Sequence, residues 1–449
     1  MKPHIFKAYD VRALYPSEID EPIARDIGRG FAAYLGARRI AVSRDMRVSS
    51  PSLAEAFIQG ALSQGADVVD LGMMATDMLY FAVASRGFDG GAQITASHNP
   101  SQYNGVKMVR AEAMPLSGDE GLAEIRDMIL QGTLPPPAPT PGLRTYDDVL
   151  AAYVEHVFSF IDEAAIKPFT CVLDAGNGMG GLVAPRLFER LPVTVIPMCM
   201  EVDGTFPNHE SNPLIEENRA HIVERVVAEK ADIGIAWDGD ADRCFFIDGT
   251  GDFVPGDFIT ALLGEAILRK HPGATIVYDL RASHAVRDVV TGMGGTAVMN
   301  RVGHSFIKRT MREQDGVFGG EVTGHYYFRE NFYADNGFIP ALMLLELMSV
   351  KGQSLAELLA PLKAKYFISG EINTKVASME VVRARLDALA ARYADGRVTH
   401  LDGVSVEYPD WHFNVRPSNT EPLLRLNLEG RTPEVMAARR DEVLGLIRG

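Results

Sequence analysis

The chain alternates short apolar strands with amphipathic helices, and this order constrains the fold more than any other feature. Residues 39–42 and 67–72 have the pattern of strands, and a helix with one apolar face begins between them at Ser50-Pro51. A helix around 79–84 and a strand at 90–94 continue the series. The alternation predicts a mainly parallel, layered α/β domain whose loops at the strand ends carry function.

The chain is too long for a single hydrophobic core. Its 449 residues predict two to four domains of roughly 100–200 residues each. The proline-rich run 134–141 is stiff and extended, which favours an interdomain linker and an end of the first domain near residue 145. A helix at 146–161 then opens a second domain, and a third domain repeats the same order of elements. From about residue 367 the pattern changes.

The charge balance limits the partners of the protein. Asp and Glu total 59 against 44 Lys and Arg, and the net charge of -15 argues against nucleic acid, which needs a basic surface. A small anionic ligand is compatible with this charge, because a local cluster of Arg, Lys and His can hold one. We expect no membrane span, since no apolar run is long enough, and no signal peptide at the start. The 3 widely spaced cysteines favour the reducing cytoplasm.

Ser97 stands at the tip of a predicted turn, Thr-Ala-Ser-His-Asn-Pro, which follows the strand 90–94. Pro100 fixes its own φ and biases the residue before it away from helix. A second turn soon afterwards brings Lys107 back toward the same point. A hydroxyl on a rigid turn beside an imidazole and an amine predicts an attacking or phosphate-carrying serine, with an ordinary surface turn as the alternative.

A loop with carboxylates at alternate positions follows a strand at 231–237. The carboxylates are Asp238, Asp240 and Asp242. In so short a loop they would repel one another unless a cation lay between them, and all-oxygen ligation suits Mg²⁺. An EF-hand calcium loop is excluded, because it needs Gly at its sixth position and Glu at its twelfth, where this chain has Arg243 and Gly249. A metal site is therefore predicted in preference to a solvated acidic loop.

Two later loops carry groups suited to sugars and phosphates. Glu321 and Thr323 are flanked by glycines that let a ligand approach the backbone, and they suit hydrogen bonds to neighbouring sugar hydroxyls. The turn Arg416-Pro-Ser-Asn-Thr-Glu-Pro422 offers a guanidinium fork, two hydroxyls and an amide. Such a set can hold a phosphate without a metal, with an ordinary polar hairpin as the alternative.

A glycine pattern leaves one alternative of another class. Gly176, Gly178 and Gly181 follow a strand with the spacing G-x-G-x-x-G, and Glu201 lies at a suitable distance downstream for a dinucleotide ribose. This spacing is compatible with a nicotinamide-dependent oxidoreductase. Tight packing between a strand and a helix explains the same glycines, so the pattern alone does not decide.

Four motifs, taken in order, carry a family resemblance. They are Thr-Ala-Ser-His-Asn-Pro, Asp-Gly-Asp-Ala-Asp-Arg, Gly-Glu-Val-Thr-Gly-His and Arg-Pro-Ser-Asn-Thr-Glu-Pro. Together they resemble the α-D-phosphohexomutase superfamily, nearest to bacterial phosphomannomutase/phosphoglucomutase, from Phe6 to the last turn. The resemblance implies three related mixed α/β domains and a smaller α+β C-terminal domain around a central cleft. The domains expected are 1–145 with the phosphoserine loop, 146–253 with the metal loop, 254–366 with the sugar loop and 367–449 with the phosphate loop.

The resemblance also implies roles for individual residues. Ser97 is expected to carry the phosphoryl group and, with Asp238, Asp240 and Asp242, to hold Mg²⁺. The catalytic set expected from the family is Ser97, His98, Lys107, Arg12, Arg243 and His304, in which Lys107 and His304 are the candidate general acid/base groups. The substrate-binding set is Glu321, Thr323, His325, Arg281, Arg416, Ser418, Asn419 and Thr420.

The reaction implied by the resemblance interconverts hexose 1-phosphate and hexose 6-phosphate, of mannose or glucose. It runs through a phosphoserine enzyme and a hexose 1,6-bisphosphate, which also serves as activator. The implied cofactor is Mg²⁺, the implied partner is a small sugar phosphate, and the implied assembly is a monomer or weak homo-oligomer. Thr323 stands where Ser is common in the family, and Ala13 where Gly is. A phosphoglucosamine mutase of the same superfamily and a phosphatase that transfers the phosphoryl group to water are the alternatives.

Overall fold

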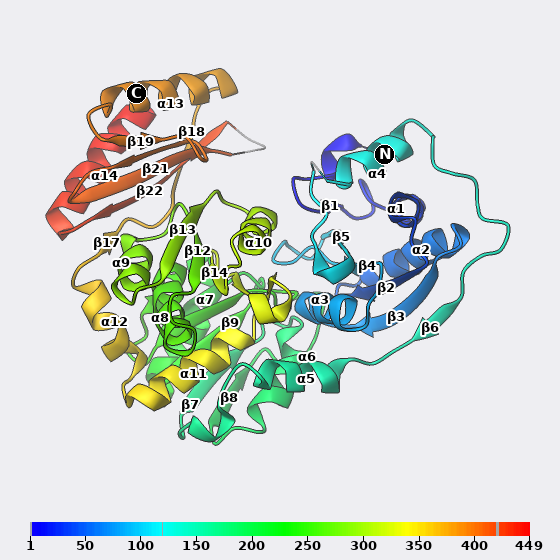
Figure 1. Cartoon of the computed structure of the whole chain (residues 1–449), viewed down its shortest axis with the longest axis horizontal. Coiled ribbons are helices and arrows are strands. Elements are labelled where there is room, and N and C mark those ends of the chain that lie inside the picture. Colours follow the sequence, from blue (N-terminus) through cyan, green and yellow to red (C-terminus); the bar gives the residue numbers. More distant parts are fainter. Residues whose placement is uncertain (1, 119, 419–421) are drawn as a thin grey trace. The chain divides into compact units, whose positions relative to one another are not determined.

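The computed structural model describes residues 2–118, 120–418 and 422–449 (Figure 1). The chain divides into two compact units. The first unit comprises Met1–Val254 and Thr323–Leu355, and the second comprises Pro255–Val322 and Ala356–Gly449. Among the described helices, none combines the length and the apolar character that spanning a bilayer requires.

The first sheet of the first unit is mixed and has the strand order β1-β5-β4-β2-β3-β6. β2 pairs in parallel with β3 and β4, and β3 with β6, whereas β5 is antiparallel to β1 and β4. Buried side chains of α1 and α2, among them Phe31 and Phe57, belong to the core cluster of this sheet. The elements are η1 (Pro3–Ile5), β1 (Val11–Leu14), α1 (Glu21–Leu35), β2 (Arg39–Arg44), α2 (Ser50–Ser63), β3 (Asp67–Met73), α3 (Thr76–Ser85), β4 (Gly90–Ile94), β5 (Tyr103–Arg110), η2 (Ala111–Ala113), α4 (Leu122–Leu130) and β6 (Arg144–Tyr146).

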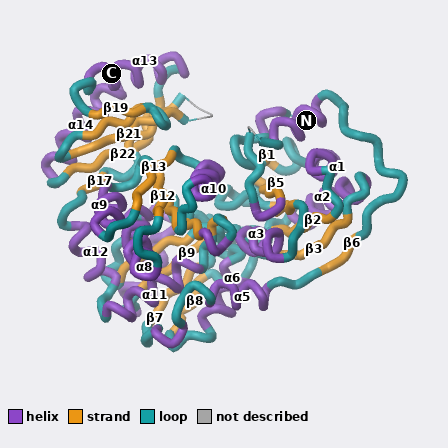
Figure 2. The backbone as a smooth tube through the Cα atoms, viewed as in Figure 1, coloured by secondary structure: helices purple, strands orange, loops and turns teal. Residues whose placement is uncertain are grey.

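The proline-rich run packs against the end of α2 and leads to a strand of the first sheet, so its interpretation as an interdomain linker is wrong. The backbone N–H of Ala138 donates to Ser63 O at 2.8 Å, and that of Gly142 donates to Leu62 O at 2.9 Å. The run passes along the outside as extended chain and delivers β6 to the edge of the sheet beside β3 (Figure 2). The helix predicted at 146–161 accordingly begins only at Leu150.

A 3-10 turn and a tight loop precede the first strand. Pro3–Ile5 is a 3-10 turn, and β1 begins only at Val11. The backbone N–H of Lys7 donates to Asp10 O at 2.8 Å and closes a turn in between. The polar residues Asp10 and Arg12 therefore lie at the beginning of a strand that pairs with β5, the strand that carries Lys107.

The second sheet of the first unit has the order β11-β10-β9-β7-β8. β7 lies between its parallel partners β8 and β9, and β10 is antiparallel to β9 and β11. Every residue of β9 and β10 is buried, and the acidic loop joins these two strands. The remaining elements of the first unit, among which β15 and β16 pair with each other and not with this sheet, are α5 (Leu150–Phe158), η3 (Glu163–Ala165), β7 (Thr170–Asp174), α6 (Gly180–Phe188), β8 (Thr194–Met198), α7 (Glu216–Glu229), β9 (Ile233–Trp237), β10 (Cys244–Asp248), β11 (Phe253–Val254), β15 (Tyr326–Phe328), η4 (Arg329–Asn331), β16 (Ala334–Asp335) and α11 (Ile339–Lys351).

The second unit contains a parallel group of strands and an antiparallel sheet. β12 pairs in parallel with β13 and β14. The sheet β17-β22-β21-β20-β19, to which β18 adds beside β22, shares one core cluster with α13 and α14. The elements are α8 (Gly256–Lys270), β12 (Thr275–Asp279), α9 (His284–Gly292), β13 (Thr296–Asn300), α10 (His304–Glu313), β14 (Phe318–Gly320), α12 (Leu355–Lys363), β17 (Phe367–Ile368), β18 (Ile372–Lys375), α13 (Met379–Arg392), β19 (Arg397–Thr399), β20 (Val404–Glu407), β21 (Trp411–Pro417), β22 (Leu423–Gly430) and α14 (Pro433–Arg448).

Candidate active site

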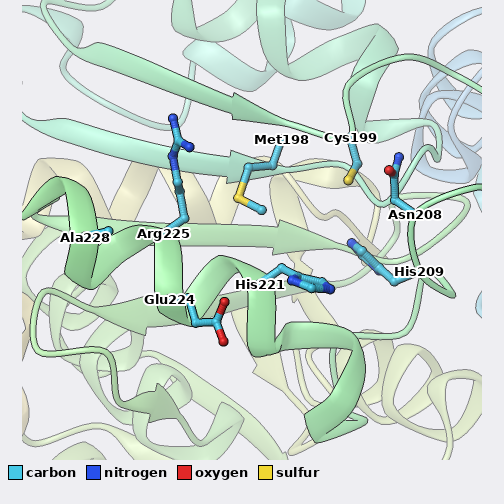
Figure 3. Close-up of a pocket in the computed structure, with 8 residues that line it drawn as sticks. All are labelled: Met198, Cys199, Asn208, His209, His221, Glu224, Arg225 and Ala228. Carbon is cyan, nitrogen blue, oxygen red and sulfur yellow. The ribbon is translucent and has the colours of Figure 1, made fainter.

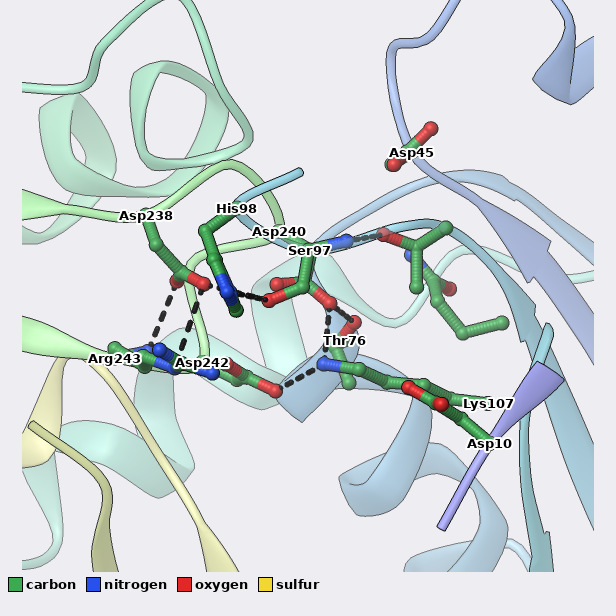
Figure 4. A network of polar contacts seen from close by, with 12 residues as sticks. Asp10, Asp45, Thr76, Ser97, His98, Lys107, Asp238, Asp240, Asp242 and Arg243 are labelled. Carbon is green, nitrogen blue, oxygen red and sulfur yellow. Dashed lines mark hydrogen bonds and ion pairs between the residues drawn. The ribbon is translucent and has the colours of Figure 1, made fainter. Parts of the chain in front are cut away.

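The serine turn and the acidic loop, which are 141 residues apart in sequence, lie side by side (Figure 4). Ser97 is buried, and its Oγ donates to Asp238 Oδ2 at 2.8 Å, while His98 Nδ1 lies 3.2 Å from the same Oγ. Ser97 has a φ of 52°, and its backbone N–H donates to Thr95 Oγ1 at 2.9 Å. Gly239 permits this approach, because a Cβ there would lie 2.5 Å from Ser97 O. The predicted nucleophile therefore lies against the predicted metal loop.

The three carboxylates of the acidic loop form one buried cluster, with a ligand oxygen of each within 4.8 Å of the others. Lys107 Nζ pairs with Asp240 Oδ2 at 2.7 Å and also with Asp242, and Thr76 Oγ1 donates to Asp240 Oδ2 at 2.5 Å. The other oxygens, Asp240 Oδ1 and Asp242 Oδ1, are buried and have no hydrogen-bond partner among the described residues. An all-oxygen cluster with unused acceptors fits a hard divalent cation such as Mg²⁺.

Burial and mutual charge set the protonation of this cluster. Burial, followed by the charges of Asp242 and Asp240, raises the pKa of Asp238 to about 7. Burial also raises the pKa of Asp240, but the ammonium of Lys107 outweighs it and leaves that pKa below its ordinary value. Burial, with the neighbouring Arg243, lowers the pKa of His98 well below its ordinary value. At neutral pH the ring of His98 is therefore uncharged beside Ser97.

Two arginines flank the serine and the carboxylates. Arg12 donates to Asp10 Oδ2 at 2.7 and 2.9 Å and also to the side chain of Asn99, in the serine turn. The backbone N–H of Arg243 donates to Asp238 Oδ1 at 3.2 Å, and its Nε donates to His325 Nε2 at 2.9 Å. Both cationic heads are thus tied to the loops that form the site.

His325 acts as an acceptor toward Arg243. A guanidinium nitrogen only donates, so His325 Nε2 accepts and the ring proton is on Nδ1. Nδ1 lies 2.8 Å from Asp335 Oδ2, in β16. The pair Asp335 and His325 therefore holds Arg243 beside Asp238, which supports the expectation that His325 belongs to the site. The role of Asp335 had no signal in the sequence, because a single Asp in a two-residue strand forms no motif.

Arg47 organises the serine turn and was also missed in the sequence. Its fully buried side chain donates to Ser97 O at 2.8 Å and to Asn99 O at 2.7 Å, and pairs with Asp45 at 3.1 Å. Two further bonds go to Pro100 O and Tyr103 O. One planar guanidinium thus satisfies four carbonyls of the turn, which an ammonium could not do.

We expect Arg47→Met to destabilise the protein by about 3–5 kcal/mol, because it leaves the buried Asp45 without its cation and the carbonyls without donors. Urea unfolding measures the loss, and turnover should fall with it because the serine turn loses its anchor. Arg47→Lys should restore only part of the stability. Arg25→Met, an exposed position on α1, serves as the matched control and should change the stability by less than about 0.5 kcal/mol. A variant at position 47 as stable as this control would contradict the anchoring role.

Ion pairs link Glu371 with Arg281 and Arg416, and Arg281 with Glu321, three of these being predicted residues of the second unit. Arg281 forms a two-pronged pair with Asp279 at 2.9 and 3.0 Å and lies 3.6 Å from Glu321. Glu371 lies 3.5 Å from Arg281 and pairs with Arg416 at 3.0 Å. Burial raises the pKa of Glu371, but Arg281 and Arg416 outweigh it and lower that pKa. Arg281 and Arg416 are therefore neighbours, as expected of one anion-binding region, and Glu371 is a further member that the sequence did not reveal.

The remaining predicted residues have mixed outcomes. His304 is the first residue of α10, and Ser418 is buried directly after the end of β21. Asn419 and Thr420 lie outside the described residues. Glu321 belongs to the second unit and Thr323 to the first, so their joint role in sugar binding stays a prediction.

The glycine pattern is explained by packing. A Cβ at Gly178 would lie 2.6 Å from Gly239 O, and one at Gly181 would lie 2.1 Å from Met200 O. Larger residues would thus clash with backbone on both sides of the turn between β7 and α6. Because Gly178 has no side chain, this turn can pack directly against Gly239 in the acidic loop. The glycine pattern therefore helps to position the carboxylates described above.

Four family models match successive parts of the chain. They are described as phosphoglucomutase/phosphomannomutase alpha/beta/alpha domain I at residues 3–135, domain II at 151–251, domain III at 255–366 and the C-terminal domain at 368–446.

Individual relatives are similar over the full length. "Phosphohexose mutases" of Xanthomonas campestris pv. campestris is 43% identical over 447 residues, and "Phosphomannomutase" of Escherichia coli is 42% identical over 453, with 99% of each chain covered in both cases. A crystal structure of a phosphoglucomutase/phosphomannomutase family protein from Burkholderia thailandensis superposes with a TM-score of 0.90 at 32% identity, covering 100% of this chain and 98% of that one.

Proposed function

The chain belongs to the phosphoglucomutase/phosphomannomutase family and is a phosphohexomutase, and from this we propose that it interconverts the 1- and 6-phosphates of mannose and glucose with Ser97 as the phosphoryl carrier. The observation that carries the proposal is the 2.8 Å contact between Ser97 Oγ and Asp238 inside the carboxylate cluster. The names of the relatives support mannose, and the descriptions of the family models support both mannose and glucose as the hexoses.

Each half-reaction moves one phosphoryl group between Ser97 and a sugar hydroxyl. The bond from phosphorus to Ser97 Oγ breaks, and a bond to the sugar oxygen forms. The hydroxyl proton passes to a base, for which His304 is the candidate, while Lys107, held as an ammonium by Asp240 and Asp242, is the candidate acid that returns a proton to Ser97 Oγ. The resulting hexose 1,6-bisphosphate turns end for end, and Ser97 takes back the other phosphoryl group. In this scheme the bisphosphate is also the activator, because it phosphorylates a dephosphorylated Ser97.

The charge that develops on the phosphoryl group needs compensation from the site. Asp238, Asp240, Asp242 and an oxygen on Ser97 would hold Mg²⁺, which supplies positive charge to the phosphoryl oxygens when bound. Arg12, Arg243 and Lys107 add cationic groups around the same oxygens, and His98 contributes an uncharged ring. Because Asp10, Asp240 and His325 orient these cations beforehand, little reorganisation accompanies transfer.

The rest of the predicted set would bind the sugar phosphate. Glu321 and Thr323 would hold sugar hydroxyls. Arg281, His325, Arg416, Ser418, Asn419 and Thr420 would hold the phosphate that is not reacting and line the cleft. The corresponding domains would be 1–145, 146–253, 254–366 and 367–449, although β6 extends across the first of these boundaries.

The test offers the purified protein mannose 1-phosphate, glucose 1-phosphate and glucosamine 1-phosphate, each with Mg²⁺ and a trace of hexose 1,6-bisphosphate. We expect 6-phosphate from the first two and little from the third, measured by ³¹P NMR. A preference for glucosamine 1-phosphate would replace the proposed substrate. Free phosphate without isomerised sugar would indicate a phosphatase.

A further inference from the structure

Three side chains of different chemistry converge at the end of β7 and just beyond β8. They are Asp174, Cys199 and His209, whose ligand atoms all lie within 4.8 Å of one another. Asp174 Oδ2 lies 3.0 Å from His209 Nε2. Cys199 and His209 line a cavity of about 470 Å³, and their side chains point toward each other there (Figure 3). Nothing in the proposed phosphoryl transfer uses these residues.

Backbone groups fix the orientation of two of them. Asp174 Oδ1 accepts from the N–H of Gly176 at 2.8 Å, so Oδ2 is the oxygen that faces the cluster. His209 Nδ1 lies 3.0 Å from Glu210 O and Nε2 lies 3.0 Å from Asp174 Oδ2; both oxygens only accept, so both ring nitrogens donate, and a cation bound at Nε2 would take the place of its proton. Histidines that bind metals are oriented by this kind of hydrogen bond from the second ring nitrogen.

Cys199 is held in place by its backbone. It has a φ of 47°, and its carbonyl accepts from the N–H of Asn177 at 2.8 Å. The side chains of Asp174 and His209 are only 2% and 8% exposed. The three ligand atoms are thus oriented by the fold and shielded from most of the solvent.

We propose that Asp174, Cys199 and His209 bind a divalent cation of borderline softness, of which Zn²⁺ is the type. A thiolate, an imidazole and a carboxylate are the donors that Zn²⁺ takes, and three protein ligands leave a fourth position for water. Binding releases the thiol proton, and any proton on Nε2, to solvent.

The proposed ion would have a structural role, because the segment between its ligands Cys199 and His209 packs near the serine turn. Gly204 packs so closely on the first domain that a Cβ there would lie 2.3 Å from Met46 O, and Arg47 lies over the ring of Phe206 at 5.3 Å. Arg47 in turn holds the serine turn through Ser97 O. A metal at Cys199 and His209 would therefore fix the segment that covers Arg47.

The test titrates metal-free, reduced protein with Co²⁺ in the presence of excess Mg²⁺, followed by Zn²⁺. We expect one equivalent of Co²⁺ to produce a near-ultraviolet thiolate-to-cobalt charge-transfer band that Zn²⁺ abolishes, because the oxygen ligands around Asp238 cannot produce such a band. Cys199→Ser should lose the band, and His209→Ala should weaken binding by about 100-fold or more. Cys171→Ser, a buried cysteine of β7 outside the cluster, is the matched control and should keep the band.

Thermal unfolding with and without Zn²⁺ is the second measurement. The midpoint should rise with Zn²⁺ for the wild type and for Cys171→Ser, but not for Cys199→Ser. Absence of the band in the wild type, or its persistence in Cys199→Ser, would refute the site and leave His209 and Asp174 as a plain ion pair. Loss of mutase activity plays no part in either measurement, so failure here leaves the proposed phosphoryl transfer unaffected.

Discussion

Ser97→Ala is expected to abolish turnover, with a loss of at least about 10⁴-fold in kcat, because no other hydroxyl in the described site contacts the carboxylate cluster as Ser97 does. The hydroxyl of Thr76 also donates to the cluster, but to Asp240 Oδ2, the oxygen that already pairs with Lys107. Initial rates with glucose 1-phosphate measure the loss. Intact mass after exposure to hexose 1,6-bisphosphate should show one phosphoryl group on the wild type and none on the variant.

The control for this variant is Ser101→Ala, in the same loop but exposed, which should keep wild-type rates. Alanine has the same Cβ as serine, so position 97 keeps its φ of 52° without additional steric cost, and the variant should still fold cooperatively. Circular dichroism on both variants separates loss of chemistry from loss of fold. Substantial turnover in a folded Ser97→Ala protein would mean that another group carries the phosphoryl.

Asp240→Asn is expected to give the second largest effect, lowering both the apparent affinity for Mg²⁺ and kcat by about 10²-fold or more. The substitution keeps the shape of the side chain but removes the charge that Lys107 pairs with at 2.7 Å. It also removes one of the buried oxygens that have no partner among the described residues. Rates measured across a Mg²⁺ titration report the two losses separately.

A charge-matched control is Glu217→Gln, on the exposed first turn of α7, which should leave the Mg²⁺ dependence unchanged. If Asp240→Asn behaved like this control, the carboxylate cluster would not be the metal site. Isothermal titration with Mg²⁺ on both variants gives the same comparison without substrate.

Residues that sit in a short motif after a strand could be predicted from the sequence. Ser97 and the carboxylates of the acidic loop belong to this group, because a buried strand that ends in polar residues at fixed spacing constrains both position and chemistry. The strand order, by contrast, depends on pairing between distant segments. β5 between β1 and β4, and β6 beside β3, could not be read from local patterns.

Residues whose side chains bind the backbone of a distant segment could not be predicted from the sequence. Arg47 binds carbonyls about fifty positions away, and a carbonyl has no residue identity to recognise. Asp335 and Glu371 act by orienting a histidine and two arginines, and each stands outside any motif. The interpretation of the proline run as a linker failed for a related reason. Its composition indicates a stiff, extended segment but does not indicate that the next strand, β6, pairs with β3.

The position of β6 bears on how the protein can be dissected. The family model for the first domain ends at residue 135, but the strand that covers the edge of β3 spans Arg144–Tyr146. A fragment that ends at residue 135 would therefore expose β3 as an unpaired edge strand, which can pair with another chain. An isolated first domain should accordingly be expressed through Tyr146, so that β6 still covers the edge of β3.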